Sequence, residues 1–304
     1  MKRTLLIAAA LVLAACDDAL QQTTDGGVGV DAAIQRAPSN LPAYFDCLRE
    51  SGFTAISAHR GGPAPGFAEN AIPTFENTLR AAPGAFLEVD ISQTGDGVLV
   101  LMHDDRADRT TTGAGAIADL DMAQLLAFQL EDERGRPVDA RVPTLSEALE
   151  WADGKTVLEL DIKRSVRFED VVSAVSAANA MNRVIFVTYS VDGAARLARL
   201  APQAMIYTTI SNARELDTLD RRGVDLTRIV AWTGTETPSA SLVESLAARG
   251  VETRFGMFGE GRNYADAMRA HAQIVAVDDA EEASRDIDAA DGEEGLAALQ
   301  CAAG

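Results

Sequence analysis

Four acidic residues form two alternating pairs, Glu88 with Asp90 and Glu159 with Asp161. Residues two apart on a β-strand point to the same face, roughly 7 Å apart at about 3.3 Å per residue. Two like charges this close repel each other unless a cation lies between them. Oxygen ligands favour Mg²⁺ or Ca²⁺ over zinc. Each pair is therefore a candidate binding site for a divalent cation. The alternative is a pair of solvated carboxylates at the end of a strand.

Two of the three histidines stand close to these acids in the sequence pattern. His59 ends one short apolar run, His103 follows another, and Lys163 continues the alternation of the second acidic pair. Near pH 7 one histidine can donate a proton while another accepts one. A lone histidine is more often structural, but a pair beside a metal site favours acid–base catalysis. The third, His271, is expected on the surface.

The elements that must position these side chains are eight short runs rich in Val, Ile and Leu, which alternate with segments of helical period. These expected strands are Thr54–Ala58, Ala85–Ile91, Thr156–Ile162, Arg183–Tyr189, Ala204–Ile210, Arg228–Thr233, Val251–Met257 and Gln273–Val277. Eight repeated βα units predict an α/β fold, a closed (β/α)8 TIM barrel. An open doubly wound sheet is the alternative, but Gly61-Gly62-Pro63 does not match its dinucleotide fingerprint. In a closed barrel the acids and Lys163 converge at the C-terminal mouth.

A long gap separates the second and third of these strands. Within it, Gly95-Asp96-Gly97 is typical of a tight turn and Val98–Met102 of a returning strand, so a hairpin is expected. Residues 104–142 are mostly polar and predict a small insertion over one rim of the barrel, with a helical patch near Met122–Leu126. The next helix should start at Thr144 and Glu147, which fit a capping box.

An ordered set of motifs covers the chain from about Thr54 to Asp279. They are Ser57-Ala58-His59-Arg60-Gly61, Glu69-Asn70, Glu88-Val89-Asp90, Thr94-Gly95-Asp96-Gly97, Val100 to Asp104, Arg109-Thr110-Thr111 with Gly113, Pro143-Thr144-Leu145 and Asp161-Ile162-Lys163. Together they resemble the glycerophosphodiester phosphodiesterase family.

The resemblance implies a role for individual residues. His59 and His103 match the family's general acid/base histidines. The matching ligands of one divalent cation, Mg²⁺ or Ca²⁺, are Glu88, Asp90 and Asp161. The family more often has Glu at the third ligand position, and because Asp is one methylene shorter, Glu159 on the same face could share the role of Asp161.

The resemblance also implies residues that bind the substrate. Arg60 and Lys163 match phosphate contacts. Glu69 matches a substrate-binding position, although the run here is Ala68-Glu69-Asn70-Ala71 rather than Pro-Glu-Asn-Thr. The family's late Trp-Thr-Val-Asn is absent; Trp232-Thr233-Gly234 occurs one strand earlier.

The implied reaction is metal-dependent hydrolysis of small glycerophosphodiesters to glycerol 3-phosphate and an alcohol such as choline or ethanolamine. The first nucleophile is either water or the glycerol 2-hydroxyl. One alternative is a lysophospholipid or other lipid phosphodiester substrate, which an apolar rim of Leu125, Leu126, Phe128 and Leu130 would favour. Another is a catalytically inactive lipoprotein scaffold.

The start of the chain predicts export. Lys2 and Arg3 precede an apolar run that ends in Leu13-Ala14-Ala15-Cys16, which resembles the lipobox of bacterial lipoproteins. We expect residues 1–15 to be a signal peptide, Cys16 to carry the lipid, 16–40 to be a tether and 41–304 to be the folded domain. The protein would be anchored to a membrane and face the periplasm. A net charge of -19 argues against a nucleic-acid partner.

The two remaining cysteines, Cys47 and Cys301, are expected to form a disulfide. An exported chain meets an oxidising compartment, where free thiol pairs tend to be oxidised. A closed barrel also brings its first and last strands side by side, so the segments that flank them can meet.

Overall fold

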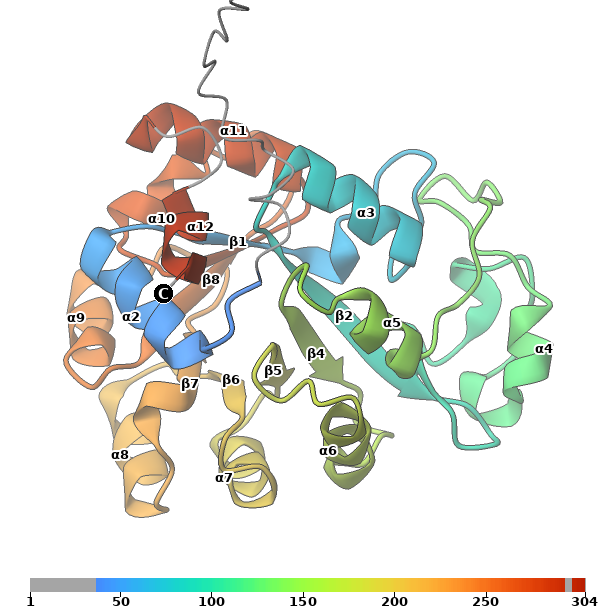
Figure 1. Cartoon of the computed structure of the whole chain (residues 1–304), viewed down its shortest axis with the longest axis horizontal. Helices are drawn as coiled ribbons and strands as arrows, with labels where there is room; N and C mark the ends of the chain where they lie inside the picture. Colours follow the sequence, from blue (N-terminus) through green and yellow to red (C-terminus); the bar gives the residue numbers. More distant parts are fainter. Residues whose placement is uncertain (1–36, 293–296, 304) are drawn as a thin grey trace, which may run out of the picture.

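Eight parallel strands close into a barrel in the computed structural model, which describes residues 37–292 and 297–303 (Figure 1). The barrel strands are β1 (Ala55–Ala58), β2 (Phe86–Gln93), β4 (Leu158–Ile162), β5 (Val184–Val187), β6 (Met205–Thr209), β7 (Ile229–Trp232), β8 (Glu252–Met257) and β9 (Ile274–Val277). Neighbours in the barrel follow the chain order, and β1 closes the ring by pairing with both β9 and β2. The predicted (β/α)8 barrel and all eight predicted strands are confirmed.

The register between β2 and β4 places the acidic pairs beside one another. Glu88 lies opposite Glu159, and Asp90 lies opposite Asp161. The two glutamates therefore lie at one level of the barrel, and the two aspartates lie two residues nearer the C-terminal mouth.

Helices cover the outside of the barrel in the layer that Figure 1 shows around the strands. They are α3 (Ile72–Ala81), α5 (Leu145–Trp151), α6 (Phe168–Ala177), α7 (Val191–Leu200), α8 (Ala213–Arg221), α9 (Ala240–Ala247), α10 (Ala265–Arg269) and α11 (Ala280–Asp291). Phe75 and Leu79 of α3 are buried against the strands, as their spacing predicts. Helix α5 begins at the predicted capping box of Thr144 and Glu147.

The N-terminal end of the barrel is closed by helix α2 (Leu41–Ser51). Its apolar face, which includes Phe45 and Leu48, packs onto core residues at the starts of the strands. The chain reaches this helix along the same end of the barrel, where the Ala37 amide donates to the Gly154 carbonyl at 3.3 Å. The end opposite the mouth is therefore filled by side chains.

Helix α12 (Ala297–Gln300) and the turn after it bring the end of the chain to α2 (Figure 1). There Cys47 and Cys301 form the predicted disulfide, with their Cα atoms 5.6 Å apart across 254 positions of sequence. The predicted signal peptide and Cys16 lie outside the described residues. Among the described residues, no helix is long and apolar enough to cross a membrane.

The predicted hairpin and insertion follow β2. Strand β3 (Leu99–Leu101) pairs antiparallel with β2, and the insertion forms a lobe that holds helix α4 (Met122–Leu126), seen at the right of Figure 1. This lobe has its own small core, in which Leu125 and Leu130 are fully buried and Phe128 is partly buried. Only Leu126 of the four candidate rim residues is well exposed, at 46%. The apolar rim that would favour a lipid substrate is therefore not formed by these residues, because their side chains mainly pack in the core of the lobe itself.

Candidate active site

Three carboxylates meet at the C-terminal mouth of the barrel. Glu88 and Asp90 of β2 and Asp161 of β4 are buried, and each offers an oxygen within 4.8 Å of the others. The Oδ1 atom of Asp161 is buried and accepts no hydrogen bond from the described residues. An oxygen-only group with an unused lone pair fits a divalent cation such as Mg²⁺ or Ca²⁺.

The charges of these carboxylates are strongly coupled to their surroundings. The pKa of Glu88 lies well above its usual range because the side chain is buried and because Asp90 and Asp161 lie close. Burial also opposes the charge of Asp90, but Lys163 and a hydrogen bond from Asn70 outweigh burial and lower the pKa of Asp90. Negative charge on Glu88 is therefore disfavoured beside Asp90 and Asp161, and a bound cation would stabilise it.

Lys163 follows β4 and provides the nearest positive charge. Its Nζ atom lies 2.5 Å from Asp90 Oδ1 and 2.9 Å from Asp161 Oδ2. Burial opposes the charge of Lys163, but these two carboxylates raise its pKa, so it remains a cation. It is positioned to meet an anionic group at the same place.

Glu159 does not join the three carboxylates. Its Oε2 atom accepts hydrogen bonds from Arg254 at 2.5 Å and from the Ser57 hydroxyl at 2.8 Å. The geometry therefore does not support a share for Glu159 in the metal-binding role of Asp161. Arg254 of β8 is a buried cation that the sequence analysis did not identify, because an arginine inside a strand carries no recognisable motif.

The two candidate histidines line one cavity of about 220 Å³ together with the carboxylates and Lys163. His59 Nδ1 lies 2.9 Å from Asp278 Oδ1, and His103 Nδ1 lies 2.7 Å from Asp104 Oδ1. A carboxylate can only accept, so each Nδ1 carries the proton and each Nε2 is left without one in the neutral ring. The pairing partners were not predicted, although Asp104 directly follows His103.

Arg60 and Asn70 hold the carboxylates through unusual backbone conformations. Both are in the left-handed region, with φ of 52° and 57°. The Arg60 amide donates to Glu88 Oε2 at 2.8 Å. Asn70 donates to Asp90 Oδ2 at 2.8 Å and accepts from the Asp90 amide at 2.9 Å. Such strain persists where the surrounding contacts enforce it, and functional sites are common places for it.

Glu69 is buried between two arginines. It accepts from Arg60 Nη1 at 3.0 Å and from two nitrogens of Arg109 at 2.8 and 2.9 Å. Glu69 therefore orients the guanidinium of Arg60, whose Nε atom lies 4.0 Å from Asp90 Oδ2. Arg109 stood in one of the sequence motifs, but nothing in its type or spacing indicated a role.

Four aromatic side chains also line the cavity: Tyr189, Tyr207, Trp232 and Phe258. The rings of His59 and Phe258 lie 5.1 Å apart, and Arg254 stacks over Tyr207 at 4.6 Å. The cavity thus presents both charged and aromatic groups to a bound molecule.

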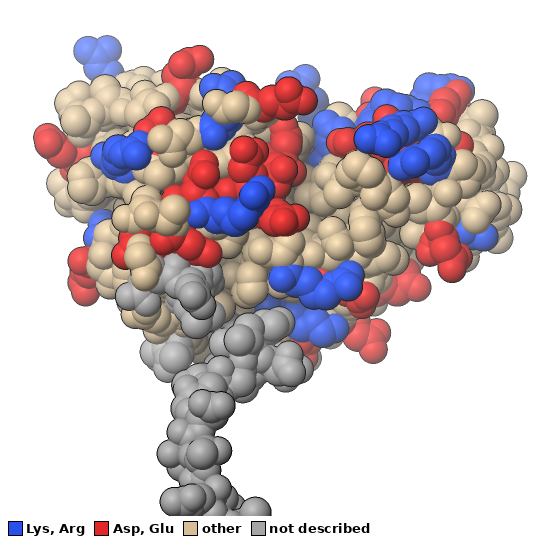
Figure 2. Space-filling view, turned by 90° about the horizontal axis from the view of Figure 1, so that it is seen from above, with Lys and Arg blue, Asp and Glu red and all other residues tan. Residues whose placement is uncertain are grey.

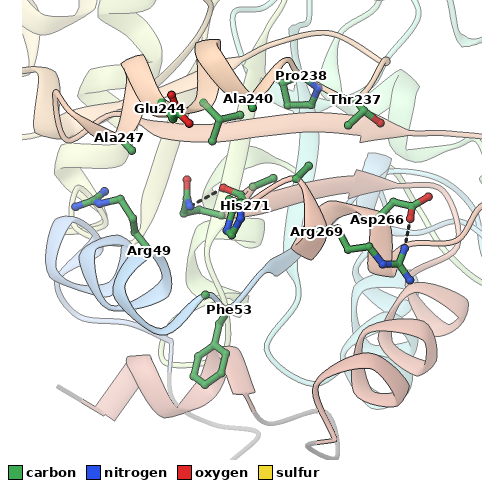
Figure 3. Close-up of a pocket in the computed structure, with 15 residues that line it drawn as sticks. Arg49, Phe53, Thr237, Pro238, Ala240, Glu244, Ala247, Asp266, Arg269 and His271 are labelled. Carbon is green, nitrogen blue, oxygen red and sulfur yellow. Dashed lines mark hydrogen bonds and ion pairs between the residues drawn. The ribbon is translucent and has the colours of Figure 1, made fainter.

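A second cavity, of about 580 Å³, lies beside α9 and α10 (Figure 3). The exposed His271 lines it, as does Arg269, which pairs with Asp266. Its cations are already held by neighbouring acids, and Arg49 at its edge pairs with Asp46 and Glu252. The groups suited to chemistry gather instead at the barrel mouth.

The surface charge is predominantly acidic. On the face in Figure 2, acidic side chains gather in the middle, and basic ones stand in separate groups. Arg60 and Lys163 are the cations that lie beside Asp90 of the carboxylate cluster.

Known proteins share both sequence and fold with this chain. A glycerophosphodiester phosphodiesterase from Caldanaerobacter subterraneus is 28% identical over 160 residues, which are 50% of this chain and 65% of that protein. The crystal structure of a glycerophosphoryl diester phosphodiesterase from Parabacteroides distasonis matches with a TM-score of 0.77 and 28% identity, over 84% of this chain and 94% of that one.

A phosphodiesterase from Oleispira antarctica, solved with the product sn-glycerol-3-phosphate, shares the fold at a TM-score of 0.61 and 19% identity, over 79% of this chain and 99% of that one. The chain spans less than two thirds of the length of the first curated relatives that it matches. Residues 59–277 match the glycerophosphoryl diester phosphodiesterase family, from the first candidate histidine to the end of the last barrel strand, and the chain belongs to this family.

Proposed function

We propose that this protein hydrolyses glycerophosphodiesters to glycerol 3-phosphate and an alcohol, with the help of one divalent cation, Mg²⁺ or Ca²⁺. The observation that carries the proposal is the meeting of His59 and His103 with three buried carboxylates in one cavity. The family match and the product-bound relative support the same reaction.

The site residues have separate tasks in this proposal. Glu88, Asp90 and Asp161 would hold the cation, which supplies positive charge to the phosphate when bound. Arg60 and Lys163 bind the phosphate oxygens and stabilise the charge that they gain in the transition state. Glu69 contributes to substrate binding by fixing Arg60.

The two histidines transfer protons. Because each Nδ1 donates to an aspartate, the Nε2 atom is the one that takes or gives the proton. One histidine deprotonates the nucleophile, and the other protonates the leaving alkoxide.

The test is a release assay on the purified protein. Glycerophosphocholine and a lysophospholipid are each incubated with the enzyme in the presence of Mg²⁺, Ca²⁺ or excess chelator. The phosphomonoester product, glycerol 3-phosphate from the first and lysophosphatidic acid from the second, is measured by phosphorus NMR. We expect release from glycerophosphocholine that stops with chelator. Cleavage of the lysophospholipid alone would support the lipid alternative, and no cleavage with either ion would support the inactive scaffold.

We also propose that the protein is exported and anchored to a membrane through lipid on Cys16, facing the periplasm. The lipobox-like run before Cys16 supports this proposal, and so does the disulfide, because such bonds form in oxidising compartments. Mass spectrometry of the N-terminal peptide should show the acyl chains on Cys16. In detergent phase partition the wild-type protein should be found in the detergent phase, whereas the Cys16→Ser variant should be found in the aqueous phase.

A further inference from the structure

Arg109 belongs to the insertion but reaches the catalytic groups at the mouth. We propose that Arg109 is a positioning residue, which holds the Asp104 carboxylate and thereby the ring of His103 in the orientation for proton transfer. The inference rests on the proposed phosphodiesterase activity. It assigns the insertion a part in the reaction.

Arg109 makes two hydrogen bonds to each of two carboxylates, those of Asp104 and Glu69. Its Nε and Nη2 atoms lie 2.7 and 3.0 Å from the two oxygens of Asp104. Its Nη1 and Nη2 atoms lie 2.9 and 2.8 Å from the two oxygens of Glu69. Paired contacts of this kind fix the plane of a carboxylate as well as its distance.

These contacts complete an alternating row of charges from one side of the mouth to the other. The row runs through Arg60, Glu69, Arg109, Asp104 and His103. Arg109 is the central member, so its loss would leave both neighbouring carboxylates with a single remaining side-chain partner each.

His103 needs this support because its ring is partly exposed. The side chain is 35% exposed, and Asp104 is 30% exposed. Asp104 could rotate toward water without its second partner. The hydrogen bonds from Arg109 lower the pKa of Asp104, which keeps it an acceptor for the Nδ1 proton.

The position of Arg109 is set by the lobe itself. Arg109 ends a short 3-10 turn, Ala107–Arg109, whose first residue is fully buried. The Ala107 amide donates to the Gly115 carbonyl at 3.0 Å, and the Thr111 hydroxyl donates to the Ala107 carbonyl at 2.9 Å. The turn is therefore anchored on both sides.

His59 is held differently. Its partner Asp278 accepts from the Gly259 amide at 3.2 Å, and among the described residues it forms an ion pair with His59 alone. Among the described residues, the aspartate that binds His103 thus has an arginine partner, whereas the aspartate that binds His59 does not. This contrast predicts that a change at Arg109 affects one histidine and spares the other.

The experiment compares Arg109→Gln and Asp104→Asn with Arg106→Gln, which removes an exposed arginine of the same lobe whose ion pair is with Asp108. The ring nitrogens are observed by ¹⁵N NMR. The chain has only three histidines, so each signal can be assigned by single replacement with alanine. Steady-state kinetics on glycerophosphocholine are measured in parallel.

In the wild type we expect neutral His103 to carry its proton on Nδ1. In Arg109→Gln we expect a mixture of the two neutral tautomers of His103, whereas the tautomer of His59 should be unchanged. The value of kcat should fall by about 10- to 100-fold, which is a large part of the contribution of general acid–base catalysis. Asp104→Asn should do the same, and Arg106→Gln should match the wild type. The ion pair of Arg106 is exposed and adds little stability, so the melting temperature of Arg106→Gln should hardly move.

Two results would overturn the proposal. One is an unchanged His103 tautomer in Arg109→Gln, in which case a rise in KM would place the effect on Arg60 and the substrate. The other is a kcat within about threefold of the wild type. If the wild type does not cleave the diester, the tautomers still test the positioning, so a failure of the proposed function is seen separately.

Discussion

Two histidines use their Nδ1 atoms to bind aspartates at the barrel mouth, and this pairing decides which atom can exchange protons with a substrate. The pairing also fixes the plane of each ring. A histidine without such a partner has no comparable restraint on its ring. His271 provides the comparison within the same chain, because it is exposed and lies by the cavity beside α9 and α10.

Replacement of either mouth histidine should abolish turnover. We expect His59→Ala and His103→Ala to lower kcat/KM by at least about 100-fold, the usual share of one acid–base group. Both side chains are partly exposed, so circular dichroism should show an intact fold. His271→Ala is the matched control and should keep full activity. Near-wild-type turnover in one variant would remove that histidine from the mechanism.

The carboxylate cluster should bind a divalent cation. Glu88→Gln keeps the size of the side chain but removes one of three anionic ligands, so Mg²⁺ or Ca²⁺ affinity should fall at least about tenfold. Titration calorimetry measures this directly. Glu150→Gln, an exposed acid on α5, should bind as the wild type does. Full activity in excess chelator would rule out the requirement for a metal ion.

At the scale of elements, the barrel strands were predictable because each is a short apolar run between polar segments. The alternation of Glu88 with Asp90 also showed correctly that both point inward. The register was not predictable, since no residue spacing tells that Asp90 pairs with Asp161. Arg254 was missed for the same reason, because only the closed barrel brings β8 close to Glu159.

Helix α2 is joined to strand β8 by an ion pair between Arg49 and Glu252. Burial is the main reason why the pKa of Glu252 rises to about 7, and Arg49 only partly offsets it. The folded protein thus binds this proton more tightly than the unfolded chain does. Protonated Glu252 therefore stabilises the folded state. This contribution to the free energy of unfolding is fully present below about pH 4.5 and is lost as the pH rises toward 7 and above.

Glu252→Gln should therefore become more stable relative to the wild type as the pH increases. The difference in free energy of unfolding should grow by up to about 3 kcal/mol between pH 4.5 and 8, at about 1.4 kcal/mol per pKa unit. Denaturant unfolding at several pH values measures it. A difference that is constant with pH would show that Glu252 has an ordinary pKa.

At the scale of the whole molecule, the disulfide ties helix α2 to the last turn of the chain. The double replacement Cys47→Ala/Cys301→Ala should lower the free energy of unfolding by about 2–5 kcal/mol, since the unfolded chain gains freedom. The bond lies at the end opposite the mouth, so kcat should be unchanged. Unfolding in denaturant, with the reduced wild type as control, tests both statements. An equally stable variant would show that packing alone holds these ends together.

The hydrogen bond from Ala37 to Gly154 places the start of the described chain at the closed end of the barrel. The start of the described chain and the opening of the barrel therefore lie at opposite ends of the molecule. If Cys16 carries a lipid as proposed, the chain that leads from the anchor joins the barrel at the end away from the opening. A freely diffusing diester can then enter without contact with the bilayer, whereas a lipid whose tails remain in the bilayer would have to reach the far end of the barrel.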